Sequence, residues 1–235
     1  MSFQGKNYLI VGASSGIGRD VAQRLIDQGA VVYSASRHQP DGLNVAKHFS
    51  FEALQADSTA FADLPETLHG VVYCPGTINL KPFHRLSLEE FRNDFQINVV
   101  GAVAVLQACA TPLKKAEGAS VVLFSTVAAK VGMSFHASVS AAKGAIEGLA
   151  KSLAAEWAPN YIRVNAVAPS LTDTPMGHFL VNTPEKVESS NKRHPLGRYG
   201  QPRDIAAMST FLLSDEAGWI TGQVFGVDGG MANLK

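Results

Sequence analysis

The stretch that decides the fold is Tyr8-Leu9-Ile10-Val11 followed by Gly12-Ala13-Ser14-Ser15-Gly16-Ile17-Gly18. The four apolar residues predict a buried strand, and apolar residues that recur every three or four positions over 17–28 predict a helix. Glycine lets the backbone turn tightly between them and come close to a ligand. A helix that begins after such a turn presents free N–H groups to an anion. The sequence therefore predicts a strand, a glycine-rich turn and a helix suited to a phosphate group.

The alternation of strands and helices continues along the chain. Further apolar runs predict strands at 30–33, 51–54, 71–73, 121–124, 162–168 and 224–227, and helical patterns lie at 88–110, 137–157 and 203–213. Strands that are apolar on both faces and separated by helices are typical of a parallel sheet covered on both sides. We expect one α/β domain over residues 1–235, a doubly wound, Rossmann-like parallel sheet of about seven strands with helices on both faces. Residues 175–200 are the least regular and are expected to form a substrate loop.

Charge and cysteine content exclude several classes of protein. Twenty Lys and Arg balance twenty Asp and Glu, so the chain has no general attraction to nucleic acid or an anionic membrane. Cys74 and Cys109 cannot make a disulfide framework, and no Cys/His cluster indicates a metal site. The start has no signal-peptide core, and the longest apolar stretch, 99–110, is too short to span a bilayer. We expect a cytoplasmic protein without metal.

The glycine turn and the following strand point to a dinucleotide. The strand–turn–helix context favours nucleotide binding over a turn without a ligand, and Ser14 and Ser15 offer further hydrogen bonds to phosphate. After the second predicted strand, no Asp or Glu occurs where NAD's ribose needs an acidic partner, whereas Ser36 and Arg37 suit a 2′-phosphate. The alternative for Arg37 is a solvated surface side chain. Asp57 is expected to cap the next element or reach the adenine. The sequence therefore favours NADP(H).

Several ordered motifs identify the chain as resembling the short-chain dehydrogenase/reductase family over nearly its whole length. They are the glycine turn, Gln96-Ile97-Asn98-Val99, residues 162–169, Ile220-Thr221-Gly222 and Val227-Asp228-Gly229-Gly230. The resemblance implies an oxidoreductase that transfers hydride between a nicotinamide cofactor and a small molecule. It places Gly76, in Tyr73-Cys74-Pro75-Gly76, close to the cofactor, where the family has Asn-Asn-Ala-Gly. It also places Pro169, Thr172 and Thr174 at the nicotinamide, although the family's Pro-Gly is here Pro169-Ser170.

The same resemblance supplies a catalytic set with one departure. The family uses a Tyr four residues before a Lys, a Ser thirteen residues before the Tyr, and an Asn upstream. Lys143, Thr126 and Asn98 fall at the Lys, Ser and Asn positions, but Val139 stands at the Tyr position. Lys143 is expected to hold the ribose, Thr126 to contact the substrate and Asn98 to place Lys143. Valine cannot transfer a proton, so the family's usual acid is missing.

His136 is the leading replacement for that acid. It lies seven residues before Lys143, about two helical turns, so both side chains share a helix face. A Tyr has this offset in the enoyl-thioester reductase branch of the superfamily, and an imidazole can donate a proton at neutral pH. The alternatives are Ser138, Ser140, Tyr199, water, or a His136 that only begins the helix.

Simpler structural interpretations stand beside these roles. Lys143 could be a solvated helix residue paired with Glu147, Asn98 a satisfied polar group and Thr126 an ordinary strand-end residue. The apolar stripe and small residues of 137–157, together with 99–110, resemble the family's subunit-contact helices and favour a homodimer or homotetramer. Four basic residues of the loop favour an anionic or thioester-carrier substrate, and the alternative is a loop that is merely solvated. These residues are Lys186, Lys192, Arg193 and Arg198.

The expected function is an NADPH-dependent oxidoreductase that transfers hydride to a carbonyl or an activated C=C of a small substrate. The alternative is a non-catalytic NADPH-binding sensor or interaction protein, in which Val139 marks lost chemistry. A structural oligomer without nucleotide is disfavoured, because it leaves the glycine turn and Arg37 without a role.

Overall fold

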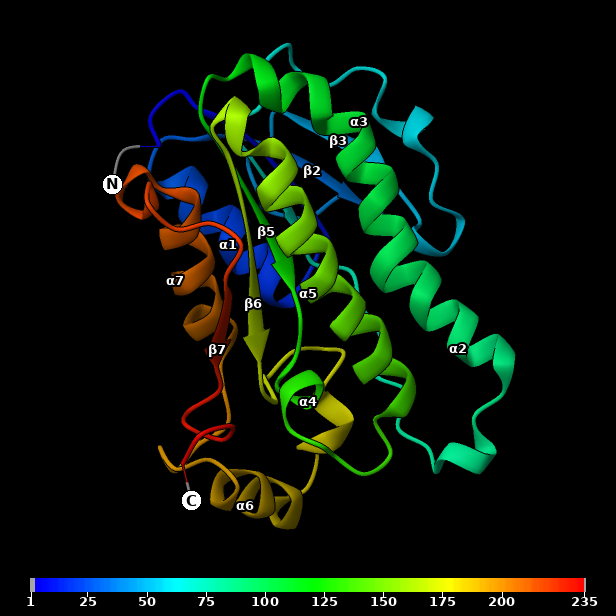
Figure 1. The fold of residues 1–235 in the computed structure, drawn as a ribbon. Coiled ribbons are helices and arrows are strands. Elements are labelled where there is room, and N and C mark those ends of the chain that lie inside the picture. The colour runs from blue at the N-terminus through cyan, green and yellow to red at the C-terminus, as the bar shows by residue number, and fades with distance from the viewer. Residues whose placement is uncertain (1–2, 235) are drawn as a thin grey trace.

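A computed structural model describes residues 3–234 and contains a seven-stranded parallel sheet (Figure 1). The strand order is β3-β2-β1-β4-β5-β6-β7. The strands are β1 (Asn7–Val11), β2 (Val31–Ser36), β3 (Lys47–Ser50), β4 (Gly70–Tyr73), β5 (Ala119–Phe124), β6 (Ile162–Pro169) and β7 (Val224–Val227). The order changes direction between β1 and β4, and such a switch point opens a crevice at the carboxyl ends of the strands. The predicted doubly wound sheet is confirmed.

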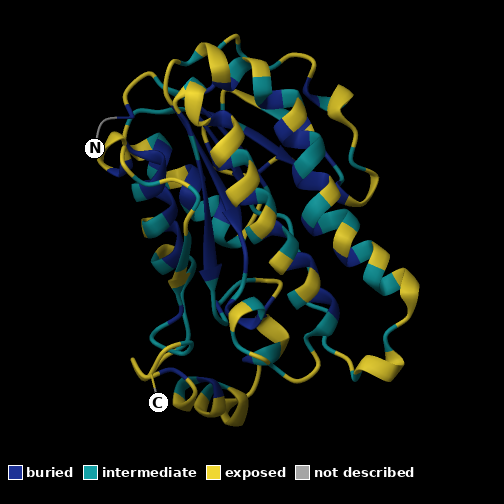
Figure 2. Ribbon diagram, viewed as in Figure 1, coloured by how far each residue is buried: buried dark blue, intermediate teal, exposed yellow. Residues whose placement is uncertain are grey.

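Helices cover both faces of the sheet (Figure 1). They are α1 (Gly16–Asp27), α2 (Leu88–Phe95), α3 (Gly101–Lys115), α4 (Val127–Lys130), α5 (Ala137–Trp157), α6 (Pro184–Lys192) and α7 (Pro202–Leu213). One apolar core packs α1 and α7 against the sheet, and a second packs α3 and α5 against the other face. Every residue of β4 and β5 is buried (Figure 2), which explains their continuous apolar runs.

Two sequence predictions of local structure are wrong. The strand predicted at 51–54 is not one: β3 ends at Ser50, and Ala53–Gln55 form a 3₁₀ turn. Phe51 and Ala53 are apolar because their side chains enter the core, whereas β3 is a half-exposed edge strand with a polar sequence. Residues 175–200 are also more regular than predicted, since they contain α6, which Thr183 caps by accepting from the Lys186 N–H.

Among residues 3–234, one continuous helical stretch, Leu88–Lys115, has the length and apolar composition of a membrane span. A core helix passes the same test, and the buried side chains of this one pack against the sheet. They are Ala102, Val105, Leu106, Cys109 and Leu113. The α3 part of the stretch thus packs on the core of the fold, whereas Leu88, Phe95 and Val100 before it are exposed.

A π-helical segment, Gln96–Val100, joins α2 to α3. The buried Tyr73 hydroxyl, at the end of β4, donates a 2.6 Å hydrogen bond to the carbonyl oxygen of Ile97 within it. Gly101 leaves room for that hydroxyl, because a Cβ there would lie 2.2 Å from it. Such π segments often occur at functional sites. Here the Tyr73 bond ties the sheet to the segment that carries Asn98.

We expect Gly101→Ala to destabilise the protein by about 1–3 kcal/mol, because the added methyl group collides with the Tyr73 hydroxyl. Tyr73→Phe should cost about 1–2 kcal/mol, since the Ile97 carbonyl loses its donor. The double variant should be no less stable than Tyr73→Phe alone, because the collision is gone. Urea unfolding measures all three, and additive losses would contradict this packing.

Candidate active site

The glycine turn after β1 has the geometry that the sequence predicted. Gly12 and Gly16 have φ of +86° and +55°, a region that favours glycine. A Cβ at Gly18 would lie 2.3 Å from the Gly12 carbonyl oxygen, so α1 begins directly against β1. Ser14 and Ser15 are exposed, and Ser15 makes no side-chain capping bond to α1. Because its first turn contains no acidic residue, the N-terminus of α1 is suited to an anion.

The segment that follows β6 lies against this turn. A Cβ at Gly16 would lie 3.1 Å from Cγ2 of Thr174, so the two loops are in direct contact. Thr172 is buried and pairs with Gly200. Pro169 is the last residue of β6. The structure therefore brings the predicted phosphate-binding and nicotinamide-binding loops together. Ile17, also expected at the cofactor, packs against the apolar core and so fixes the start of α1.

The residues expected at the adenosine end differ in availability. The Ser36 hydroxyl donates to the His38 carbonyl oxygen at 2.7 Å, and Asp57 accepts from the backbone N–H and hydroxyl of Thr59. Asp57 thus acts as a cap, one of its two predicted roles. The side chain of Arg37 is 72% exposed, with its Nε 3.9 Å from a Glu52 carboxylate oxygen. Arg37 is therefore the cation available to a ligand here.

Three residues meet where the sheet's carboxyl edge faces α5. A Cβ at Gly76 would lie 3.2 Å from Asn98 Oδ1 and 3.3 Å from Lys143 Nζ, so a side chain here would crowd both groups. The Asn98 amide donates to Thr77 Oγ1 and the Asp94 carbonyl oxygen at 3.0 and 2.8 Å. Its own oxygen is buried without a hydrogen-bond partner in the described structure. The site thus presents an unsatisfied acceptor beside an ammonium group.

The Lys143 side chain lies inside the protein, where burial lowers its pKa to about 8 while Cys74 and Asp94 raise it. Glu147 accepts instead from the Ser125 hydroxyl at 2.6 Å. The interpretation of Lys143 as a solvated partner of Glu147 is therefore wrong. A lysine near its pKa at neutral pH can hold a ligand hydroxyl in either protonation state.

The remaining predicted catalytic residues make local hydrogen bonds, and within residues 3–234 neither is hydrogen-bonded to Asn98 or Lys143. Thr126, just beyond β5, caps α4 by accepting from the Ala128 N–H. His136 precedes α5, and its Nδ1 donates to the Ser134 carbonyl oxygen at 2.7 Å, which leaves Nε2 as its second functional atom. Along the helix axis His136 lies about 10 Å from Lys143. Val139 is buried one turn before Lys143.

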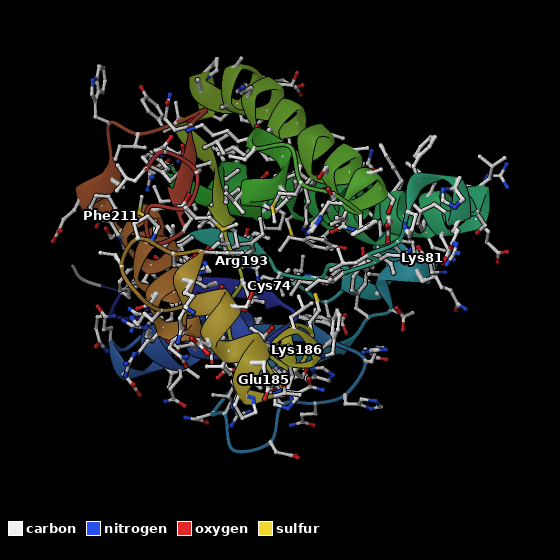
Figure 3. All side chains as sticks on the ribbon, turned by 90° about the horizontal axis from the view of Figure 1, so that it is seen from below. Cys74, Lys81, Glu185, Lys186, Arg193 and Phe211 are labelled. Carbon is white, nitrogen blue, oxygen red and sulfur yellow. The ribbon has the colours of Figure 1, made fainter. Side chains whose placement is uncertain are left out.

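The other proposed proton donors are less available or farther along the chain. The hydroxyl of Ser140 donates to the Ala128 carbonyl oxygen at 3.0 Å, and Ser138 is buried. The backbone N–H of Tyr199 donates to Asn191 Oδ1 in the segment after α6. Seen from below, α6 crosses the carboxyl ends of the strands (Figure 3). Lys186 lies on α6, Arg193 directly follows it, and Cys74 lies behind the helix in this view. The prediction that residues 175–200 form a substrate loop stays a prediction.

Sequence reasoning did not identify two polar features of the site. Ser170 donates to His194 Nε2 at 2.9 Å, and His194 Nδ1 donates to the Ser190 carbonyl oxygen at 2.7 Å. This links the loop after β6 to the segment after α6. The second feature is the buried Asp94 beside Asn98. Neither follows a known spacing pattern, so no sequence signal marked them. Within residues 3–234, no group of three or more His, Cys, Asp or Glu could hold a metal ion.

The two thiols should be unreactive in the folded protein, Cys109 because it is buried and the half-buried Cys74 because its thiol stays protonated. A Cβ at Gly18 would lie 3.1 Å from Cys74 Sγ, and burial raises the pKa of both Cys74 and Cys109 to about 12. Because the thiolate is the nucleophile, we expect Ellman's reagent at pH 8 to label neither thiol until urea unfolds the chain. Rapid labelling of one thiol in the native protein would show that Cys74 is open to the cleft.

Comparison with known proteins agrees with this architecture. Residues 12–232 match the family model described as enoyl-(acyl carrier protein) reductase. A tropinone reductase homologue of Arabidopsis thaliana is 34% identical over 98% of this chain and 94% of its own. L-xylulose reductase of Bos taurus is 33% identical over 96% of both chains.

Solved structures give the same result. A short-chain type dehydrogenase/reductase from Mycobacterium ulcerans superposes with a TM-score of 0.92 and 30% identity, covering 100% of this chain and 92% of that one. A candidate NAD(P)-dependent gluconate 5-dehydrogenase from Beutenbergia cavernae, solved with NADP at low occupancy, gives a TM-score of 0.90 and 26% identity over 98% of both. With its glycine turn, its Asn98–Lys143 site and these relatives, the chain belongs to the short-chain dehydrogenase/reductase family of NAD(P)-binding oxidoreductases.

Proposed function

We propose that the protein is an NADP(H)-dependent oxidoreductase that transfers hydride to a carbonyl or an activated C=C of a small substrate. The observation that carries the proposal is the buried Lys143 ammonium, which lies with Asn98 Oδ1 around the Gly76 backbone. Such a site offers a donor and an acceptor to ligand hydroxyls in a crevice that already suits a phosphate. The whole chain acts as one unit, with residues 175–200 closing over the substrate.

The residues fit an NADP(H) molecule along the crevice. The glycine turn, Gly12 to Gly18 with Ser14 and Ser15, would hold the pyrophosphate at the end of α1. Arg37, with Ser36 beside it, would pair with the 2′-phosphate. Asp57 would border the adenine, and Gly76 with Lys143 would border the nicotinamide ribose. Pro169, Thr172 and Thr174 would contact the nicotinamide, which supplies the hydride when bound.

The protein's chemical task is to orient the substrate and deliver a proton. Thr126 would hydrogen-bond the substrate oxygen, while Asn98 and Lys143 keep the ribose in place. Since Val139 cannot donate a proton, we assign that role to His136 Nε2, because Nδ1 is engaged by Ser134. An enone or enoyl thioester would suit this arrangement, because hydride goes to its β-carbon and the proton is needed elsewhere.

A second candidate function is NADPH binding without turnover, as a sensor or interaction protein. Val139 favours it, because the family's Tyr position carries no ionisable group. This alternative predicts tight cofactor binding and no reduction of any substrate. For either function we propose a cytoplasmic homodimer or homotetramer. Exposed apolar side chains on and before the α2–α3 stretch, namely Phe83, Leu88, Phe95 and Val100, support a subunit contact there.

We expect Arg37→Asp to weaken NADPH binding by roughly ten- to a hundredfold, because a charge-assisted pair with the 2′-phosphate is lost. NADH binding should change little or improve. Fluorescence titration with both cofactors measures this preference, and Arg92→Asp, at an exposed site on α2, controls for the charge change. Equal loss for NADPH and NADH would contradict the role given to Arg37.

Lys143→Ala should abolish NADPH oxidation with pooled carbonyl and enoyl-thioester substrates, whereas Lys151→Ala, at an exposed site on the same helix, should not. His136→Ala should lower kcat by about a hundredfold or more, as expected for loss of a general acid. Exposed His84→Ala is its control. Full activity in His136→Ala would refute the acid assignment. Saturable NADPH binding without wild-type turnover would favour the non-catalytic alternative.

A further inference from the structure

Asp94 is a carboxyl group in the protein interior. Its residue is 3% exposed, on α2 one helical turn before Asn98, and its Oδ2 has no hydrogen-bond partner in the described part of the chain. A buried carboxylate without compensation is strongly unfavourable. The surroundings of Asp94 must therefore supply a positive charge or ordered water.

The charged groups around Lys143 identify that compensation. Cys74, at the end of β4, is a neutral thiol at physiological pH because burial raises its pKa to about 12. Glu147, one turn further along α5, is bound to Ser125 next to β5. From α2, the charge of Asp94 raises the pKa of Lys143 and so opposes the effect of burial. The charge of Asp94 thus favours the charged form of Lys143, although the two side chains form no direct ion pair within residues 3–234.

Two further orphaned atoms lie on the same helices. In residues 3–234, the buried side-chain atoms without a hydrogen-bond partner are Asp94 Oδ2, Asn98 Oδ1 and Ser138 Oγ. The helix α2 and the π segment, which carry Asp94 and Asn98, both pack on α5, which carries Ser138 and Lys143. Buried polar groups of this kind are commonly joined by ordered water.

We propose that Asp94 is a positioning residue whose carboxylate, through ordered water shared with Asn98 and Ser138, is the counter-ion that keeps Lys143 charged and in place. In this arrangement the Lys143 ammonium group interacts with Asp94 through water on one side. Its other side faces the Gly76 loop and can bind a ligand. Only the identity of that ligand, the cofactor ribose, rests on the proposed function. The pairing of Asp94 with Lys143 is a property of the cofactor-free protein.

Competitive labelling tests the pairing directly. The rate at which acetic anhydride acetylates Lys143, followed by mass spectrometry across pH, gives the midpoint at which Lys143 loses its proton. The wild-type midpoint should lie near 8. Asp94→Asn should lower it by about one unit, whereas Glu89→Gln, which removes an exposed charge from the same helix, should leave it unchanged. An unchanged midpoint in folded Asp94→Asn would overturn the proposal.

A stability cycle gives a second, independent measurement. With Lys143 present, Asp94→Asn removes the counter-ion and should lower the melting temperature. With Lys143→Met, the same change removes an unpaired carboxylate and should raise it. Asp94→Ser provides a second charge-removing variant if Asp94→Asn does not fold. An effect of the same sign in both backgrounds would show that Asp94 has a merely structural role.

The two proposals can fail separately. Neither labelling nor melting requires cofactor, so the Asp94–Lys143 result stands even if NADPH does not bind. If NADPH binds and Asp94→Asn leaves both the Lys143 midpoint and the melting cycle unchanged, the proposed function survives and the role of Asp94 does not. In an active enzyme, Asp94→Asn should also shift the basic limb of the kcat profile to lower pH.

Discussion

An ammonium group held out of water at the carboxyl edge of the sheet is the constraint on which the site depends. Burial lowers the pKa of Lys143 to about 8, and the nearby charge of Asp94 opposes this effect. A Cβ at Gly76 would contact both Lys143 and Asn98, and the buried Asp94 lies one helical turn before Asn98. A cation kept in this way is ready to bind hydroxyl and anionic groups without further rearrangement.

The fold supplies this arrangement through a few close approaches. Gly12 and Gly18 let α1 begin against β1, and Gly16 allows Thr174 to close on the same turn. On the other side, Tyr73 holds the π segment that carries Asn98, in the space left by Gly101. Of the two residues that stand at the family's asparagine positions, Tyr73 bonds the π segment and Cys74 lies against the glycine turn, so both have structural contacts here.

The sequence predicted the sheet and the glycine turn because parallel strands buried on both faces are visibly apolar. It failed at β3, an edge strand whose polar residues carry no such signal, and in α6, whose only mark was Thr183-Pro184 at its start. Lys143 and Asn98 were found through a resemblance to a family with known spacing. Asp94 and the Ser170–His194 bond could not be found, because they depend on contacts between segments far apart in the chain.

The central claim, a partly charged Lys143 that receives the cofactor, is tested most directly by calorimetry of NADPH binding at pH 8 in buffers with different ionisation enthalpies. Because the pKa of free Lys143 is about 8, hydrogen bonds from its ammonium group to the ribose hydroxyls should favour the protonated form, so binding at pH 8 should take up as much as about half a proton per site. Lys143→Met should bind more weakly and without this uptake. NADPH binding to the wild type with no proton uptake, or no binding, would contradict the account.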